Sequence, residues 1–138
     1  MRYVLDTNAV SALMKGSPAF VARMRRMHRD DVAVPQPVLA ELRYGIARLP
    51  HSRRRRVLEG LLDGIAEELD RCPWTDDVSA RFGEAKAVLE RRGERLEDFD
   101  VAIAAHALAS GATLVTADRA HMPRIPGLDV EDWSVGAG

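Results

Sequence analysis

Residues 1–14 read MRYVLDTNAVSALM, and the fold follows from this stretch. The run from Tyr3 to Leu5 favours a short strand, Asp6 ends it, and the apolar residues after Asn8 favour a helix. The stretch therefore predicts a strand, a turn and a helix, with a carboxylate at the carboxyl end of the strand. In open parallel α/β sheets, ligands bind at that edge. Asp6 taken alone is equally compatible with a helix N-cap, since Asp, Thr and Asn all cap well.

The rest of the chain continues to alternate strands and helices. Short apolar runs at 32–34 and 112–115 predict strands, a last short strand is expected between 125 and 133, and residues 72–74 favour either a strand or a bend. Apolar residues at helical spacing predict helices over 18–27, 36–49, 53–71, 76–92 and 98–110. This alternation predicts an α/β fold whose parallel sheet is covered on both faces.

Length and composition narrow the class of protein. A chain of 138 residues predicts a single domain spanning 1–138, and its net charge of −1 gives no overall attraction to polyanions. Cys72 is the single cysteine, which excludes an internal disulfide and a multi-cysteine zinc site. No apolar run approaches membrane-spanning length, and the chain starts in a strand without a signal-peptide pattern. A cytoplasmic protein that does not enter a membrane is expected.

Four carboxylates occupy positions where their negative charge needs a compensating partner. Asp6 and Asp118 each follow a predicted strand, whereas Glu41 and Asp100 lie on helices whose other faces are apolar. Like charges that approach one another raise each other's pKa, and a bound divalent cation removes that conflict. Oxygen ligands without a Cys/His cluster favour Mg²⁺ or Mn²⁺ over zinc. An acid-walled pocket with such a metal and no paired nucleophile suits hydrolysis of a phosphodiester bond.

Four motifs in order carry a family resemblance. They are LDTN at 5–8, LAELRYG at 39–45, DVAIAAHA at 100–107 and LVTAD at 114–118. Together they resemble PIN-domain proteins, specifically the VapC-type toxin ribonucleases of bacterial toxin–antitoxin pairs. The resemblance covers nearly the whole chain and implies a three-layer α/β/α sandwich with a mainly parallel sheet. Ala117 is a mild departure, because the fourth motif more often has an Asn near Asp118.

The resemblance also implies an activity, a cofactor and partners. By motif position, Asp6, Glu41, Asp100 and Asp118 match the family's catalytic and metal-binding acids. The implied activity is cleavage of RNA by a Mg²⁺- or Mn²⁺-dependent endoribonuclease, a hydrolase that a cognate antitoxin neutralises. A homodimer is expected as well.

Several polar residues near these acids allow two interpretations. Thr7, Asn8 and Thr116 are ordinary turn residues, or they orient a water molecule or a phosphate beside the acids. Ser11 lies one helical turn after Thr7 and belongs with them on the second interpretation. Asp98 is interpreted as a cap of the helix that carries Asp100, where a carboxylate stabilises a helix by about 0.3–1 kcal/mol.

Other titratable residues have simpler interpretations. His106 lies in an apolar helix and is expected to be a core or supporting histidine. His121 has no ligand spacing, and no role is assigned to it. The run Arg53–Arg56 is either a solvated helix face or a contact for RNA or antitoxin, since four cations in a first turn oppose the helix dipole.

Two other functions compete with the ribonuclease. The first is a catalytically weak PIN-like binding module that acts mainly through an antitoxin complex and uses its acids to hold a partner's arginine. The second, weaker one is a phosphatase with an aspartyl nucleophile. Phosphatases of the haloacid dehalogenase type require a second Asp two residues after the first, and this chain has Asn8 there.

Overall fold

The fold is described from a computed structural model, and the structure describes residues 1–134. The strands are β1 (Tyr3–Leu5), β2 (Val32–Pro35), β3 (Asp70–Cys72), β4 (Thr113–Val115) and β5 (Val130–Glu131). The α-helices are α1 (Thr7–Met14), α2 (Pro18–Arg25), α3 (Gln36–Ala47), α4 (Arg53–Glu68), α5 (Asp76–Arg91) and α6 (Asp98–Ser110). Two short 3-10 helices, η1 (Arg29–Asp31) and η2 (Met122–Arg124), precede β2 and β5.

The strands form one parallel sheet in the order β3-β2-β1-β4-β5, so the first strand of the sequence lies at its centre. Tyr3 aligns with Val32 on one side and with Thr113 on the other. The chain adds β2 and β3 on one side of β1, and then β4 and β5 on the other. The order therefore reverses between β1 and β4, and a crevice for ligands is expected at the carboxyl ends of these strands.

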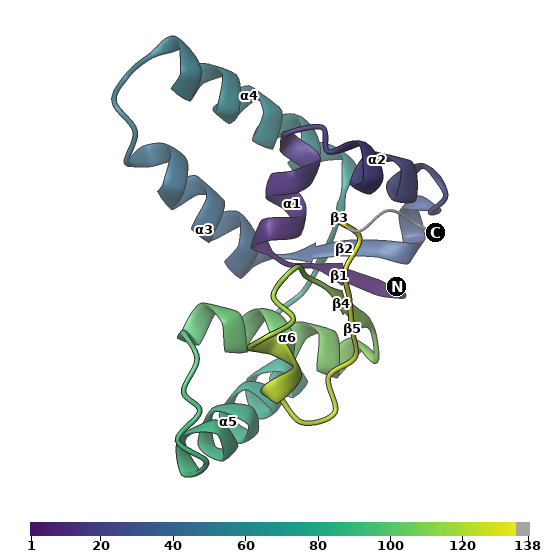
Figure 1. Cartoon of the computed structure of the whole chain (residues 1–138), viewed down its shortest axis with the longest axis vertical. Helices are drawn as coiled ribbons and strands as arrows, with labels where there is room; N and C mark the ends of the chain where they lie inside the picture. Colours follow the sequence, from purple (N-terminus) through teal and green to yellow (C-terminus); the bar gives the residue numbers. More distant parts are fainter. Residues whose placement is uncertain (135–138) are drawn as a thin grey trace.

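Helices cover both faces of the sheet, as the buried residues show. Every residue of β1 and β2 is buried, which a strand in a parallel sheet achieves only when both of its faces are covered. Figure 1 shows α3 and α4 as one helix pair toward the top of the view and α5 and α6 as a second pair toward the bottom. Helix α6 packs on β1 and β4, and its alanine-rich sequence permits this close approach. The predicted α/β sandwich is confirmed.

The structure corrects one predicted boundary. The helix expected over 53–71 ends at Glu68, and Asp70–Cys72 forms the edge strand β3 beside β2. The Arg71 side chain donates hydrogen bonds at 2.7 Å to the carbonyl oxygens of Leu69 and Ala66. These bonds satisfy acceptors that the end of α4 leaves unpaired, so the chain leaves the helix earlier than its apolar pattern indicates.

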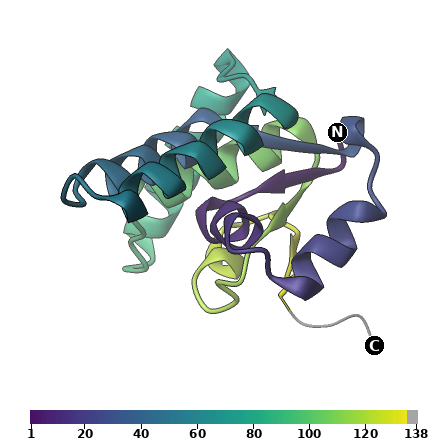
Figure 2. The same cartoon turned by 90° about the horizontal axis from the view of Figure 1, so that it is seen from above.

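The remaining elements follow the sequence pattern closely. Helix α6 has the predicted bounds, and the other helices differ by a few residues at their ends. Figure 2 shows the same arrangement from above, with α1 directly after the central strand. No helix within residues 1–134 combines the length and the apolar content needed to cross a membrane.

Candidate active site

Asp6 caps helix α1 from the end of the central strand. Its Oδ1 accepts a hydrogen bond from the backbone N–H of Ala9 at 2.9 Å, and its Oδ2 accepts one from Nδ2 of Asn8 at 3.1 Å. The residue is only 3% exposed. The capping interpretation is thus correct in geometry, and it also holds the carboxylate at the crevice between β1 and β4.

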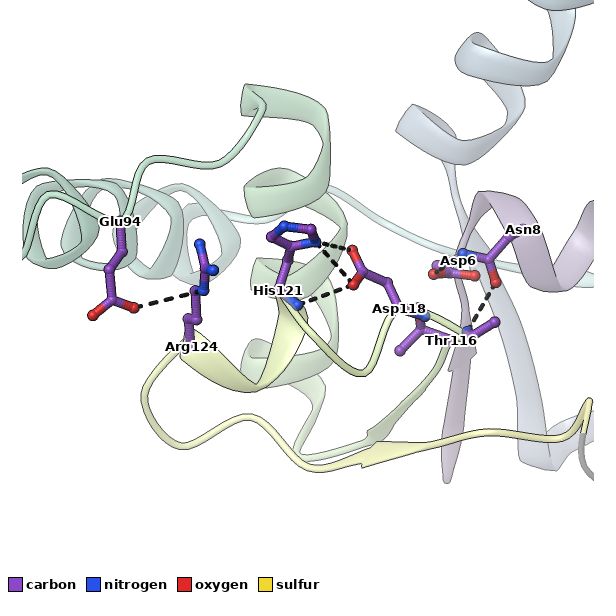
Figure 3. A network of polar contacts seen from close by, with 8 residues as sticks. Asp6, Asn8, Glu94, Thr116, Asp118, His121 and Arg124 are labelled. Carbon is purple, nitrogen blue, oxygen red and sulfur yellow. Dashed lines mark hydrogen bonds and ion pairs between the residues drawn. The ribbon is translucent and has the colours of Figure 1, made fainter.

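Asp118 reaches the same crevice from the loop after β4 (Figure 3). The backbone N–H of Asp118 donates to Oγ1 of the buried Thr116 at 2.9 Å, which sets the turn. The Oδ1 atom of Asn8 accepts a hydrogen bond from the backbone N–H of Ala117 at 3.0 Å. The Asn8 amide therefore joins the two loops that carry Asp6 and Asp118.

Glu41 and Asp100 come to this crevice from helices α3 and α6. Oγ1 of Thr7 donates a 2.7 Å hydrogen bond to Oε1 of Glu41, which ties α3 to the start of α1. Burial raises the pKa of Asp100, and the negative charges of Glu41, Asp118 and Glu97 raise it further. Glu41, Asp100 and Asp118 also line one pocket, so these acids face a common space.

The carboxyl group of the buried Asp6 is strongly perturbed. Burial raises its pKa from 3.8 to about 6, hydrogen bonds from Thr116 and Ala9 oppose the rise, and the charges of Asp100 and Asp118 add to it. A nearby cation stabilises the ionised form of a carboxylate held in this way. Strongly shifted acids in a cleft are typical of functional sites.

A pocket of about 640 Å³ opens above these acids. Its walls come from α3, the segment before α6, the first turn of α6, and the loop after β4. They consist of Glu41, Arg95, Leu96, Glu97, Asp98, Phe99, Asp100, Asp118 and His121. The more deeply buried Asp6 is not among these lining residues. The pocket is thus dominated by carboxylates.

His121 is a contact that sequence reasoning missed. Its backbone N–H donates to Oδ1 of Asp118 at 3.0 Å, and its Nδ1 lies 3.1 and 3.2 Å from the two carboxylate oxygens (Figure 3). Both oxygens are acceptors, so Nδ1 carries the hydrogen. Burial raises the pKa of Asp118, but the hydrogen bonds and the charge of His121 outweigh burial and lower it. The only sign of this contact in the sequence is that His121 follows Asp118 by three residues.

The donor chemistry of the site fits a hard divalent cation. Asp6, Glu41, Asp100 and Asp118 offer only carboxylate oxygens, the ligands that Mg²⁺ and Mn²⁺ prefer. No cluster of three or more acidic, histidine or cysteine side chains with metal-binding geometry occurs within residues 1–134. Mg²⁺ takes only one or two carboxylates and keeps waters and substrate oxygens as its other ligands, so the site does not require such a cluster.

Two of the remaining predicted residues, Asp98 and Ser11, make no hydrogen bond to the four acids, although Asp98 lines the same pocket. Glu97, not Asp98, is the N-cap of α6, and the Asp98 carboxylate lies 2.9 Å from Nζ of Lys86. The capping interpretation of Asp98 is therefore wrong in detail, although Asp98 remains in the first turn. No side-chain hydrogen bond of Ser11 to an acid occurs in the described part of the chain.

His106 is a core residue, as expected. It is fully buried, and its Nδ1 donates to the carbonyl oxygen of Ala102 at 2.7 Å. The Trp74 ring packs edge-on against it at a centroid distance of 5.1 Å. Its Nε2 atom has no partner among the described residues, and burial lowers its pKa. The contact with Trp74 packs the segment before α5 against α6.

The chain belongs to the PIN-domain family, whose model matches residues 3–128. It is 32% identical over 135 residues to ribonuclease VapC2 of Rickettsia felis, covering 96% of this chain and 98% of that protein. It is also 28% identical over 134 residues to a tRNA(fMet)-specific endonuclease VapC of Shigella flexneri, covering 97% and 99%. The predicted family is confirmed.

Solved structures agree with this assignment. VapBC2 of Rickettsia felis bound to a DNA fragment from its promoter contains a chain with a TM-score of 0.86 and 29% identity, covering 96% of this chain and 99% of that one. A chain in DNA-bound VapBC of Salmonella typhimurium has a TM-score of 0.86 and 26% identity, covering 96% and 98%.

Proposed function

We propose that this protein is the endoribonuclease toxin of a toxin–antitoxin pair and that it hydrolyses RNA phosphodiester bonds with a divalent cation. The observation that carries the proposal is the convergence of Asp6, Glu41, Asp100 and Asp118 at the point where the strand order reverses. Its relatives of similar length are ribonucleases named VapC, which supports the same activity. With RNA as its substrate, the protein is proposed to act in the cytoplasm.

The four acids have different proposed roles. Asp6, Asp100 and Asp118 would hold Mg²⁺ or Mn²⁺, directly or through ordered waters, and Glu41 would act as a further ligand or as the base that orients the attacking water. When bound, the cation neutralises the acids, stabilises charge on the phosphate and promotes attack by water. Thr7 holds the Glu41 carboxylate by its 2.7 Å hydrogen bond, so Glu41 is positioned before substrate arrives.

The remaining polar residues position these acids. Asn8 joins the loops of Asp6 and Asp118, and Thr116 sets the turn that presents Asp118. His121 holds both oxygens of Asp118. Ser11 and Asp98 stay predictions as supporting residues, since neither contacts one of the four acids by a hydrogen bond among the described residues.

Removal of the metal tests the proposal. RNA cleavage is expected to vanish in excess EDTA and to return with Mg²⁺ or Mn²⁺. Direct attack by water leaves 5′-phosphate and 3′-hydroxyl ends, which end-labelling measures. Full activity in excess chelator, or a 2′,3′-cyclic phosphate product, would contradict the mechanism. The alternative, a weak binding module, requires that no metal restores cleavage although antitoxin still binds.

A cognate antitoxin is the proposed protein partner. The similar chains of known structure belong to VapBC2 of Rickettsia felis and VapBC of Salmonella typhimurium, and the family resemblance implies a toxin–antitoxin pair for this chain as well. The carboxylate-lined pocket supports an inhibitor that places a basic side chain among the acids and buries an apolar segment on the toxin. Co-expression with the gene of the proposed antitoxin should yield a stable complex, and failure to co-purify any partner would argue against a toxin–antitoxin pair.

A homodimer is the proposed assembly. Trp74 and Phe99 are 50% and 47% exposed, and both border an apolar groove of about 590 Å³ along the first turns of α3. Exposed aromatic residues around such a groove are typical of protein interfaces. A second copy related by a two-fold axis is the occupant we infer, because an isologous contact buries the same aromatic surface on both copies.

A further inference from the structure

Arg95 is the one lysine or arginine among the residues that line the carboxylate pocket. It lies in the segment that joins α5 to α6, ahead of Glu97 and Asp98 in the same wall. Sequence reasoning assigned it no role, because one more arginine in an arginine-rich chain carries no pattern. Its place in the pocket is visible only in the fold.

The guanidinium of Arg95 forms no ion pair within residues 1–134. No carboxylate of residues 1–134 lies within 4.0 Å of it, and it makes no side-chain hydrogen bond in that range. Its basic neighbours are engaged: Lys86 lies 2.9 Å from Asp98, and Arg124 lies 3.8 Å from Glu94 (Figure 3). The Lys86 pair also neutralises Asp98, so the wall around Arg95 is less negative than its residue types indicate.

A charged guanidinium beside an acid pocket has a use when the substrate is a polyanion. RNA carries a phosphate on every nucleotide, and only one phosphate would bind a cation held by the four acids. The flanking phosphates meet Glu97 and the outer wall, where like charges repel them. A guanidinium binds a phosphate through two parallel hydrogen bonds, which supplies both charge and orientation.

We infer that Arg95 binds a backbone phosphate next to the scissile one and so holds the RNA strand across the pocket. This inference rests on the proposed ribonuclease function. Arg95 is a substrate-binding residue, and it takes no part in the attack of water. It therefore acts mainly on affinity and on the salt dependence of binding, and little on the rate of the bound complex.

Arg92 supplies a matched control. It ends α5 as the C-cap, is exposed like Arg95, has no carboxylate within 4.0 Å in residues 1–134, and does not line the pocket. Arg95→Gln and Arg92→Gln remove the same charge three residues apart, so a general loss of positive charge affects both equally. Arg95→Lys keeps the charge and removes the planar fork of hydrogen-bond donors.

Binding is measured by fluorescence anisotropy with a labelled, unstructured RNA of about 20 nucleotides, long enough to extend past both sides of the pocket. Each variant carries Asp6→Asn, which keeps the RNA intact, and Mg²⁺ is present. Arg95→Gln is expected to weaken binding about 5-fold, and Arg95→Lys about 2-fold. Between about 50 and 200 mM salt, the slope of log affinity against log salt should fall by about 0.7 in Arg95→Gln, the value for one lost phosphate contact. Arg92→Gln should match the parent protein.

Single-turnover cleavage of the same RNA, with Asp6 intact, separates binding from chemistry. Arg95→Gln is expected to raise the half-saturating protein concentration by the same factor and to leave the maximal rate within about 2-fold. Equal behaviour of Arg95→Gln and Arg92→Gln, or an unchanged salt slope, would overturn the inference, as would a lost maximal rate with unchanged affinity. A wild-type protein that does not cleave with Mg²⁺ refutes the proposed function instead, and the anisotropy experiment still decides the role of Arg95.

Discussion

At the scale of single residues, Asp6 joins structure and site in one side chain. The Oδ1 atom caps α1 through Ala9, while burial and the neighbouring acids raise the carboxyl pKa to about 6. The sequence allows two interpretations of Asp6, a helix cap or a site acid, and the geometry satisfies the first without displacing the second. A cap at the end of a central strand necessarily faces the edge of the sheet where ligands bind.

The acids differ in their expected sensitivity to substitution. Asp6→Asn, Asp100→Asn and Asp118→Asn should each lower the cleavage rate by about 100-fold or more, because each removes a charge that is proposed to hold the cation while keeping the shape. Glu41→Gln should follow with a smaller loss. Growth under induction and single-turnover cleavage measure the effect, and circular dichroism confirms folding. A toxic, fully active Asp6→Asn or Asp118→Asn protein would contradict the assignment of the four acids.

The raised pKa of Asp6 also predicts how stability without metal depends on pH. Above pH 6 both the folded and the unfolded states carry an ionised Asp6, and the difference between 3.8 and about 6 costs the folded state about 3 kcal/mol. As the pH falls from 6 toward 3.8, the folded state takes up the proton first, so that cost disappears.

Asp6→Asn removes this cost while keeping the cap, since Asn caps about as well as Asp. In EDTA at pH 7.5 the variant should melt about 5–10 °C above the wild type, and the gap should close toward pH 4. Differential scanning calorimetry of the two proteins measures it, and a gap that widens on acidification would show the opposite sign. Comparing the two proteins cancels the titration of His106, whose pKa burial lowers in both.

At the scale of the element, the first turn of α6 gives its two acids, Asp98 and Asp100, different surroundings. Asp100 faces Glu41 and Asp118, whereas Asp98 pairs with Lys86 on α5. The sequence presents both acids on one helix start, and only the packing of α5 against α6 distinguishes them. In the Arg53–Arg56 run on α4, the structure likewise distinguishes residues that look alike in sequence. Arg55 donates hydrogen bonds to Glu59 at 2.9 Å and to the carbonyl oxygen of Leu49 at 3.0 Å.

Asp98→Asn should therefore be much milder than Asp100→Asn. It loses an exposed ion pair, whose free energy is about 0–1 kcal/mol, and keeps the four acids intact. Cleavage within about 3-fold of the wild type is expected for Asp98→Asn, compared in parallel with Asp100→Asn under the same Mg²⁺ concentration. An inactive Asp98→Asn beside an active Asp100→Asn would reverse the assignment of this pair.

At the scale of the whole molecule, the strand order creates the site. Placing β1 at the centre, with β4 added on the side opposite β2, brings residues 6 and 118 to one crevice although most of the chain separates them. Helices α3 and α6 then contribute one acid each from their first half. The Trp74–Phe99 groove lies beside this pocket and shares Phe99 with it, which puts the proposed dimer contact next to the active site.

The proposed homodimer predicts a specific weak point. Phe99→Asn should shift the protein toward the monomer by about 10-fold or more in dissociation constant, because a large aromatic side chain near an interface centre contributes strongly to affinity. Light scattering during size-exclusion chromatography measures the mass. Val57→Asn is the matched control, since Val57 is a 52% exposed apolar residue on α4 away from the groove. A wild-type protein that is monomeric at every concentration would exclude the dimer.

The sequence by itself determined the alternation of strands and helices and the bounds of α6, because apolar periodicity and the residues that end elements act locally. It predicted the four acids through the order of its motifs, and their joint role stays a prediction. It could not determine where α4 ends, since that depends on the pairing of β3 with β2 and on the Arg71 bonds to Leu69 and Ala66. Only the tertiary structure brought His121 to Asp118, Lys86 to Asp98 and Arg95 to the pocket wall. Contacts between side chains far apart in sequence, or across a turn without a motif, follow from the packing of whole elements, and no local pattern encodes them.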